Sequence, residues 1–381
     1  MTERRPYEVF PPGDFIREEI EWRGWTQEVL AEILGISLRR VNEVIKGKRR
    51  VTPETARALG KAFGTSAEFW MNLESTYRLW LTEDADEAVE RRSRLYDEYP
   101  LKAMMKRGWI KESSDVDELE RSVLGFFHIS KVGETPATFA HAARKSTSYR
   151  GLTREQRAWL LRAWTLASHA PAENYTKPRL EKSLGRLRAL LVDVGRLTEV
   201  PSVLADGGVR LVLVEQLPGT RIDGAAFWLN AKSPVVALSL RFNRIDGFWH
   251  TLLHDLRHIL HRDVTPSDEP LLDIDLLGEH VTRDEARPHA EERADAEAAE
   301  FLIPQDKLDG FIRQVHPYYS KKKITAFAET LGIHPGIVVG QLQHSGEIPY
   351  SHSRDMLEKV CDVVCDATVT DGWGYRPQLG D

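Results

Sequence analysis

The chain has 381 residues, more than one ordinary hydrophobic core accommodates, so we expect two or three domains. Hydrophobic residues make up 41% and charged residues 29%, a balance that excludes an intrinsically disordered chain. The formal net charge of −6 excludes a general attraction to polyanions, so a surface for nucleic acid has to be a local patch.

The first 81 residues contain a run of short predicted helices. Apolar residues recur there at helical spacing, and Thr26, Ser37 and Thr52 stand where helix N-caps are expected. Pro53 follows the last of these at the first helical position. These start signals agree with one another and predict a compact helical domain.

A helix-turn-helix is the motif that this helical run fits. It needs a small residue where its helices touch, a glycine in the turn, and branched apolar residues beneath the second helix. The segment that starts at Gln27 supplies Ala31, Gly35, Val41 and Val44 at these places. We therefore predict a helix-turn-helix in this segment.

The second helix of the motif and its exit carry an excess of positive charge. Residues 37–50 hold six cations and one acid, Glu43, which gives a local net charge of +5. Such an excess suits phosphate contacts, and polar side chains beside it suit base edges in a major groove. The alternative is a solvated basic face on a small helical bundle. The predicted DNA-binding residues are Gln27, Ser37, Arg39, Arg40, Asn42, Lys46, Lys48 and Arg49.

The next stretch, residues 82–195, shows little recognisable chemistry. Its first part, 82–100, is polar and charge-dense, which predicts a solvated helical connector that ends near Pro100. Residues 101–195 continue with helical spacing and predict a helical middle region.

The period of the sequence changes at residue 209. Apolar, β-branched runs predict the strands of a small sheet at 209–214, 225–229 and 235–240. Helical spacing returns at 248–261, an acidic loop is expected at roughly 263–290, and a helix at 291–301 stops before Pro304. We therefore expect an α+β fold that is mostly α.

Four histidines lie on one stripe of the helix predicted at 248–261, since they recur at steps of four and three residues. They are His250, His254, His258 and His261. Two imidazoles one turn apart supply half of a zinc site, and a carboxylate from another helix commonly completes it. Glu291 and Glu292 are the natural donors. The alternative is a polar helix whose histidines are satisfied by carboxylates.

The end of the chain echoes its beginning. Residues 328–334 match 31–37 as a helix, a glycine turn and a second helix, but the later helix is nearly uncharged. We therefore expect this segment to pack against the rest of the protein rather than to bind phosphate. No apolar run reaches ~18 residues and no leader precedes the helices, so we expect a cytoplasmic protein.

The two cysteines lie near the end of the chain. Cys361 and Cys365 are four residues apart and lack a second pair, which excludes a disulfide framework and a zinc ribbon. We interpret them as ordinary buried thiols.

The segment from Pro11 to Trp80 resembles the HigA-type antitoxins of the XRE repressor superfamily. The motifs that carry the resemblance are Gly35 to Ser37, Asn42 to Arg49 and Phe63 to Leu73. The resemblance implies a homodimer bound to a palindromic double-stranded DNA operator, usually that of its own promoter.

The order of sheet, H-x-x-x-H helix and acidic helix resembles the ImmA/IrrE metallopeptidases. The downstream segments 333–344 and 348–352 are similar to the C-terminal extension of proteins that fuse an XRE domain to this peptidase. The resemblance implies Zn²⁺ as cofactor and His254, His258 and Glu291 as its ligands.

Asp255 stands where the family has its catalytic glutamate in H-E-x-x-H. Its carboxylate ends about 1.5 Å short of a glutamate's. General-base catalysis requires hydrogen-bond reach, so Asp255 is a doubtful general base.

Two further residues depart from the family pattern. Arg257 replaces a residue that is often small, and Glu297 replaces a residue that is usually aromatic. The sequence leaves two roles open for Arg257: it binds a substrate carboxylate, or it plugs the site by pairing with Asp255 or an acid of the 263–290 loop.

We interpret the chain as a DNA-binding transcriptional regulator of antitoxin or autorepressor type with a zinc metallopeptidase-like sensor domain. A toxin or a repressor is the expected protein partner. One alternative is an active zinc endopeptidase that cleaves a repressor or itself, and another is an interaction scaffold in which both motifs are vestigial. The expected domains are 1–81 (DNA-binding), 82–195 (helical connector and middle region), 196–304 (metallopeptidase-like), 305–360 (packing module) and 361–381 (tail).

Overall fold

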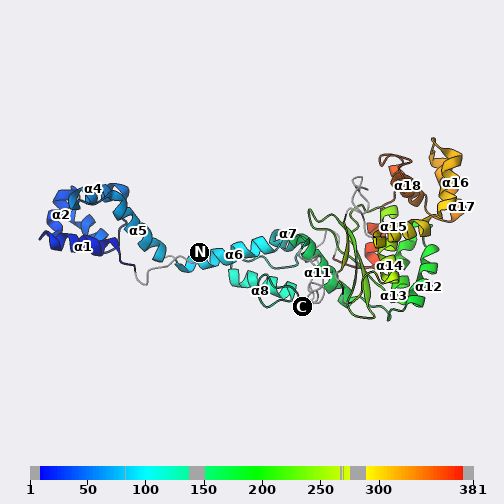
Figure 1. The fold of residues 1–381 in the computed structure, drawn as a ribbon, viewed down its shortest axis with the longest axis horizontal. Helices are drawn as coiled ribbons and strands as arrows, with labels where there is room; N and C mark the ends of the chain where they lie inside the picture. The colour runs from blue at the N-terminus through cyan, green and yellow to red at the C-terminus, as the bar shows by residue number, and fades with distance from the viewer. Residues whose placement is uncertain are drawn as a thin grey trace. The chain divides into compact units, whose positions relative to one another are not determined.

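The computed structural model describes residues 9–81, 83–136, 151–266, 268, 270–274 and 289–371. The chain divides into two compact units, Met1–Ser93 and Arg94–Asp381 (Figure 1). Apart from residues 82–93, the ranges expected for the middle region, the metallopeptidase-like domain and the packing module all lie in the second unit.

The first unit is helical. Its helices are α1 (Pro12–Trp22), α2 (Gln27–Leu34), α3 (Leu38–Ile45), α4 (Pro53–Phe63) and α5 (Ala67–Leu81), and α6 (Glu83–Glu98) crosses into the second unit. Buried apolar residues from these helices surround Trp70, which is fully buried. The unit therefore has a hydrophobic core of its own.

Local sequence signals explain where the helices of the first unit begin. The predicted N-caps Thr26, Ser37 and Thr52 each accept a hydrogen bond from the backbone N–H three residues later, at 3.3 to 3.4 Å. Gly35 ends α2 with φ of 65°, a left-handed conformation that glycine adopts without strain. The predicted helix, glycine turn and second helix are confirmed.

The second unit begins with helices for which the sequence predicted a helical region but no individual bounds. They are α7 (Leu101–Lys106), α8 (Val116–Phe127), α11 (Arg154–His169), α12 (Lys177–Arg188), the 3₁₀ helix η2 (Val194–Glu199) and α13 (Val200–Asp206). After the sheet begins come α14 (Ile245–His261), α15 (His289–Leu302), α16 (Gln305–Val315), α17 (Lys321–Leu331), α18 (Pro335–His344), η3 (Arg354–Met356) and α19 (Cys361–Ala367). The mostly helical α+β class is confirmed. In the described part of the chain, no helix has the length and apolar composition that crossing a bilayer requires.

A five-stranded mixed sheet lies at the centre of the second unit, with the order β4-β2-β3-β1-β5. Its strands are β1 (Arg210–Leu213), β2 (Ile222–Trp228), β3 (Pro234–Leu238), β4 (Leu271–Ile274) and β5 (Val369–Thr370). β1 pairs in parallel with β3 and β5, whereas β2 pairs antiparallel with β3 and β4. The three predicted strands are confirmed, and the two edge strands were not predicted.

Both faces of the sheet are covered by helices. Alternate residues of a strand point to opposite faces, so Leu211 and Leu213 of β1 join one hydrophobic core while Val212 between them joins another. Helix α14 packs on the first face, and α11 packs on the second (Figure 1). The strands are therefore apolar on both sides.

Residues 361–371 are part of the second unit rather than a tail, since α19 covers Cys361–Ala367 and β5 adds Val369–Thr370 to the sheet. β5 pairs with β1, and Asp371 follows it. The Asp371 carboxylate accepts a hydrogen bond from Trp109 Nε1 at 2.7 Å and from Arg162 Nε at 2.7 Å, all within the buried interior. A strand of two residues carries no sequence period, which is why the pattern did not reveal it.

Candidate functional site

Helix α3 presents the predicted basic surface of the first unit. The side chain of Arg39 is 89% exposed, and Lys46, Lys48 and Arg49 are exposed beside it. Val41, Val44 and Ile45 lie on the opposite side of the helix and are buried in the core. The apolar face therefore fixes the helix while its charged face stays in solvent.

Glu43 is the acid within this basic surface. Its carboxylate accepts hydrogen bonds from Arg39 Nε at 3.0 Å and from Arg49 Nε at 2.8 Å. The hydrogen bonds from Arg49 and Arg39 hold the pKa of Glu43 below its ordinary value. Glu43 thus joins two guanidinium groups that are six and four residues away from it along the chain.

The remaining predicted DNA contacts lie around the same helix. Gln27, Arg40 and Asn42 are half-buried, and Gln27 is the first residue of α2. Ser37 is exposed, but its hydroxyl caps α3 by accepting the backbone N–H of Arg40. The Ser37 hydroxyl therefore stabilises the start of the helix that carries the cations.

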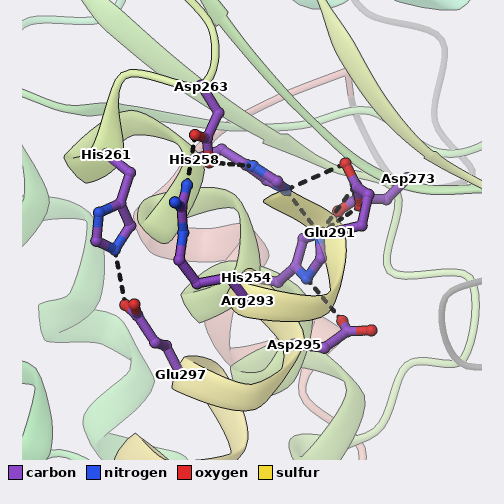
Figure 2. Close-up of polar contacts among 9 residues, drawn as sticks. All are labelled: His254, His258, His261, Asp263, Asp273, Glu291, Arg293, Asp295 and Glu297. Carbon is purple, nitrogen blue, oxygen red and sulfur yellow. Dashed lines mark hydrogen bonds and ion pairs between the residues drawn. The ribbon is translucent and has the colours of Figure 1, made fainter. Parts of the chain in front are cut away.

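A cluster of histidines and carboxylates lies between α14 and α15 in the second unit (Figure 2). His254 and His258 are one turn apart on α14 and fully buried, with their Nε2 atoms 3.0 Å apart. Oε2 of Glu291 lies 3.3 Å from His254 Nε2, and its Oε1 lies 3.5 Å from His258 Nε2. The structure therefore brings the three predicted metal ligands together, whereas Glu292 is exposed on α15.

Asp273 of β4 joins this cluster, and the sequence analysis did not name it. Its Oδ1 lies 3.5 Å from His254 Nε2, and its ligand atom lies within 4.8 Å of those of His254, His258 and Glu291. The sequence placed Asp273 in an acidic loop. The one local indication was that this acid is flanked by apolar residues, in the sequence Leu271 to Ile274.

Two further carboxylates lie close to the Nδ1 atoms of His254 and His258 (Figure 2). Asp295 Oδ1 lies 2.8 Å from His254 Nδ1, and Asp263 Oδ2 lies 3.0 Å from His258 Nδ1. Arg293 donates to Asp263 at 2.5 Å. Carboxylates in these places keep the proton of a neutral imidazole on Nδ1 and leave Nε2 free to act as a ligand.

The electrostatics of the cluster are those of a site with excess negative charge. Burial opposes protonation of His254, but Asp273, Asp295 and Glu291 outweigh it and raise its pKa. Burial likewise opposes ionisation of Glu291, but its contacts with His254 and His258 lower its pKa to about 2. Imidazole and carboxylate are donors that suit zinc, so the residues present fit this ion.

Asp255, the doubtful general base, is fully buried. Neither of its carboxylate oxygens has a hydrogen-bond partner among the described residues. Burial, and next the charge of Asp273, raise its pKa. The carboxylate packs against β2, because a Cβ placed on Gly224 would lie 2.5 Å from Asp255 Oδ2.

Arg257 pairs with an acid of α15 among the residues that the structure describes. Its Nη1 lies 3.5 Å from Glu297 Oε2, and its guanidinium lies 5.7 Å from the ring centre of Phe301. His261 Nε2 contacts the same carboxylate of Glu297 at 2.8 Å. Arg257 therefore faces α15 and pairs with Glu297 rather than with Asp255, whereas most acids of the 263–290 loop lie outside the described residues.

Similarity to known proteins is concentrated in the helix-turn-helix. Residues 16–70 match the family described as Helix-turn-helix. Virulence-associated protein I of Dichelobacter nodosus is 33% identical over 79 residues, which cover 20% of this chain and 73% of that protein. Antitoxin HigA-1 of Vibrio cholerae is 34% identical over 84 residues, which cover 22% of this chain and 76% of that protein. The solved structure of Pseudomonas aeruginosa antitoxin HigA with the higBA promoter shares 33% identity over 21% of this chain and 88% of its own, with a TM-score of 0.20.

Proposed function

Since the chain belongs, through its N-terminal unit, to the helix-turn-helix family that includes antitoxin HigA-1, we propose that it is a DNA-binding transcriptional regulator of antitoxin or autorepressor type. The observation that carries this proposal is the exposed basic face of α3. Exposed cations release counterions when they meet phosphate, and this release supplies much of the affinity for duplex DNA.

The proposed contacts divide by chemistry. Lys46, Lys48 and Arg49 are exposed beyond or at the end of α3 and suit phosphates, which lack sequence information. Arg39 and Asn42 lie on the helix itself and carry the donors and acceptors that read guanine and adenine edges. Glu43 holds the guanidinium of Arg39 in place before DNA arrives.

We propose that the regulator binds a palindromic operator as a homodimer. One recognition helix covers one half-site, so two-fold symmetry of the protein matches a palindrome in the DNA. Large apolar side chains stay exposed on the first unit, as expected of a surface that a second copy covers. They include Trp22, Ile33, Trp80 and Leu81.

The experiment that tests DNA binding compares two double variants in a gel-retardation assay. We expect Arg39→Ala with Asn42→Ala to abolish retardation of the promoter fragment of the chain's own gene. The matched control is Arg57→Ala with Asn72→Ala, which removes the same two residue types from exposed positions of α4 and α5. Retardation that survives in the α3 variant would refute the assigned helix.

We propose further that the second unit is a zinc-binding, metallopeptidase-like sensor with His254, His258 and Glu291 as ligands. Zinc supplies a Lewis acid when it is bound. The chain's own residues position it: α14 aligns the two imidazoles, α15 brings the carboxylate, and Asp295 and Asp263 orient the rings. As a protein partner, a toxin or a repressor fits the family resemblance.

Metal content tests this second proposal. We expect the purified chain to carry one zinc ion and His254→Ala to lose it, as measured by elemental mass spectrometry. His261→Ala is the matched control, because this histidine lies on the same helix but contacts Glu297 instead of the cluster. A wild-type chain that takes up no zinc on titration would refute the metal site.

The alternative is an active zinc endopeptidase that cleaves a repressor or itself. The two histidines and Glu291 favour it, whereas the buried carboxylate of Asp255 argues against it, because a general base has to reach the proton that it removes. Incubation of the zinc-loaded chain alone, and with a repressor protein added as substrate, tests this alternative by mass spectrometry. Fragments formed by the wild type and not by His254→Ala would favour the peptidase.

A further inference from the structure

We propose that Asp273 is a fourth protein ligand that closes the metal site. The inference rests on the zinc site proposed above and goes beyond its three ligands. A catalytic zinc has three protein ligands and one open position, whereas a structural zinc has four protein ligands. The position of Asp273 therefore decides what kind of site the second unit holds.

Three of the distances among the four side chains, those between an imidazole nitrogen and a carboxylate oxygen, suit a shared ion better than direct hydrogen bonds. Zinc bonds of about 2.0 to 2.2 Å in a tetrahedron place neighbouring ligand atoms about 3.3 to 3.6 Å apart. His254 Nε2 lies 3.3 Å from Glu291 and 3.5 Å from Asp273, and His258 Nε2 lies 3.5 Å from Glu291. Hydrogen bonds between nitrogen and oxygen are mostly shorter, at about 2.7 to 3.2 Å.

The orientation of the imidazoles also calls for a cation. Each Nδ1 faces a carboxylate, so a ring that binds the ion would carry its proton on Nδ1 and offer the lone pair of Nε2. The Nε2 atoms of His254 and His258 are 3.0 Å apart. An ion between these two nitrogens and the carboxylates would accept the lone pairs of both rings.

The burial of Asp273 gives independent support. Asp273 is 5% exposed, and its Oδ2 has no hydrogen-bond partner among the described residues. A buried carboxylate without compensation costs several kcal/mol, so such groups are paired or bind metal. With neutral imidazoles, Asp273 and Glu291 together carry two negative charges, which a divalent ion neutralises.

The backbone places Asp273 at the cluster. β4 pairs antiparallel with β2, and Asp273 lies opposite Gly224, next to an irregularity in the register. It is the buried residue of its four-residue strand. The carboxylate is thus delivered by a strand of the sheet, and the ion would tie β4 to α14 and α15 (Figure 2).

Cobalt substitution in the full chain tests the number of protein ligands. In the wild type we expect the absorption of four-coordinate Co²⁺, with no change when acetohydroxamate is added. In Asp273→Ala we expect the Co²⁺ spectrum to shift on addition of acetohydroxamate, because a position has opened. Chelator competition should show zinc affinity lowered by about 100-fold or more, since even outer residues of metal sites contribute 10- to 100-fold.

Asp268→Ala is the matched control, because Asp268 is an exposed acid of the same segment. We expect it to keep the wild-type spectrum and affinity. A wild-type Co²⁺ form that binds acetohydroxamate, or an Asp273→Ala variant with unchanged zinc affinity, would overturn the four-ligand site while leaving the three-ligand site intact. A wild type that binds neither Zn²⁺ nor Co²⁺ would overturn both proposals.

Discussion

The guanidinium nitrogen Nη1 of Arg257 lies 3.5 Å from Oε2 of Glu297, so α14 and α15 are joined by an ion pair beside the proposed metal site. The side chain of Arg257 is only 15% exposed. The sequence singled out both residues as unusual for the pattern that the segment resembles, and the structure brings the two into contact. They therefore act together as one ion pair.

We expect Glu297→Gln to destabilise the second unit by roughly 1–2 kcal/mol, a value between those of exposed and buried ion pairs. Glutamine keeps the size of the side chain but leaves the half-buried charge of Arg257 without its partner. Urea denaturation of the full chain, followed by tryptophan fluorescence, measures the change. Glu292→Gln on the exposed face of α15 is the control. Identical midpoints for the two variants would show that the pair contributes nothing.

Gly224 makes room for the buried carboxylate of Asp255. A methyl group on Gly224 would lie 2.5 Å from Asp255 Oδ2 and 2.8 Å from Thr251 Cγ2. We expect Gly224→Ala to destabilise the fold by about 1–3 kcal/mol, since overpacking forces the neighbours to move.

Gly185 provides the comparison for Gly224→Ala in the same denaturation assay. It lies on an exposed position of α12, where an added methyl group meets nothing within 4 Å. We expect Gly185→Ala to stabilise the chain by about 0.5–1 kcal/mol, because alanine loses less entropy than glycine in a helix. Equal midpoints for the two alanine variants would contradict the proposed close approach of Gly224 and Asp255.

The sequence predicted what is set by local order and missed what depends on distant partners. The caps Thr26, Ser37 and Thr52 were predictable because capping involves residues three apart. His254 and His258 were predictable because one helical turn separates them. Asp273 was missed because its role depends on pairing with β2, roughly fifty residues earlier in the chain.

The ion pair of Arg257 was missed for the same kind of reason. Glu297 is forty residues further along, and nothing in the helix that carries Arg257 indicates how α15 packs against it. The sequence did single out both residues as unusual.

Asp371 anchors the segment that follows α19 inside the second unit. Its side chain is almost fully buried and holds both Arg162 and Trp109. We expect Asp371→Ala to destabilise the fold by roughly 3–5 kcal/mol, because the change leaves the buried guanidinium of Arg162 uncompensated. Asp366→Ala, at an exposed position of α19, should change the stability by less than about 0.5 kcal/mol. A small effect of Asp371→Ala would mean that residues 369–371 behave as a tail after all.

The basic face of α3 predicts how DNA binding responds to salt. Each phosphate contact releases counterions, so the logarithm of the binding constant falls linearly with the logarithm of salt concentration. We expect Lys46→Ala and Lys48→Ala each to reduce the magnitude of this slope by about 1 and to weaken binding to all sequences alike. Fluorescence anisotropy between about 50 and 200 mM salt measures the slope. Lys61→Ala removes an exposed cation from α4 and should leave the slope unchanged. If all three lysine variants keep the wild-type slope, the phosphates meet another surface of the first unit, and α3 is not the helix that lies against the duplex.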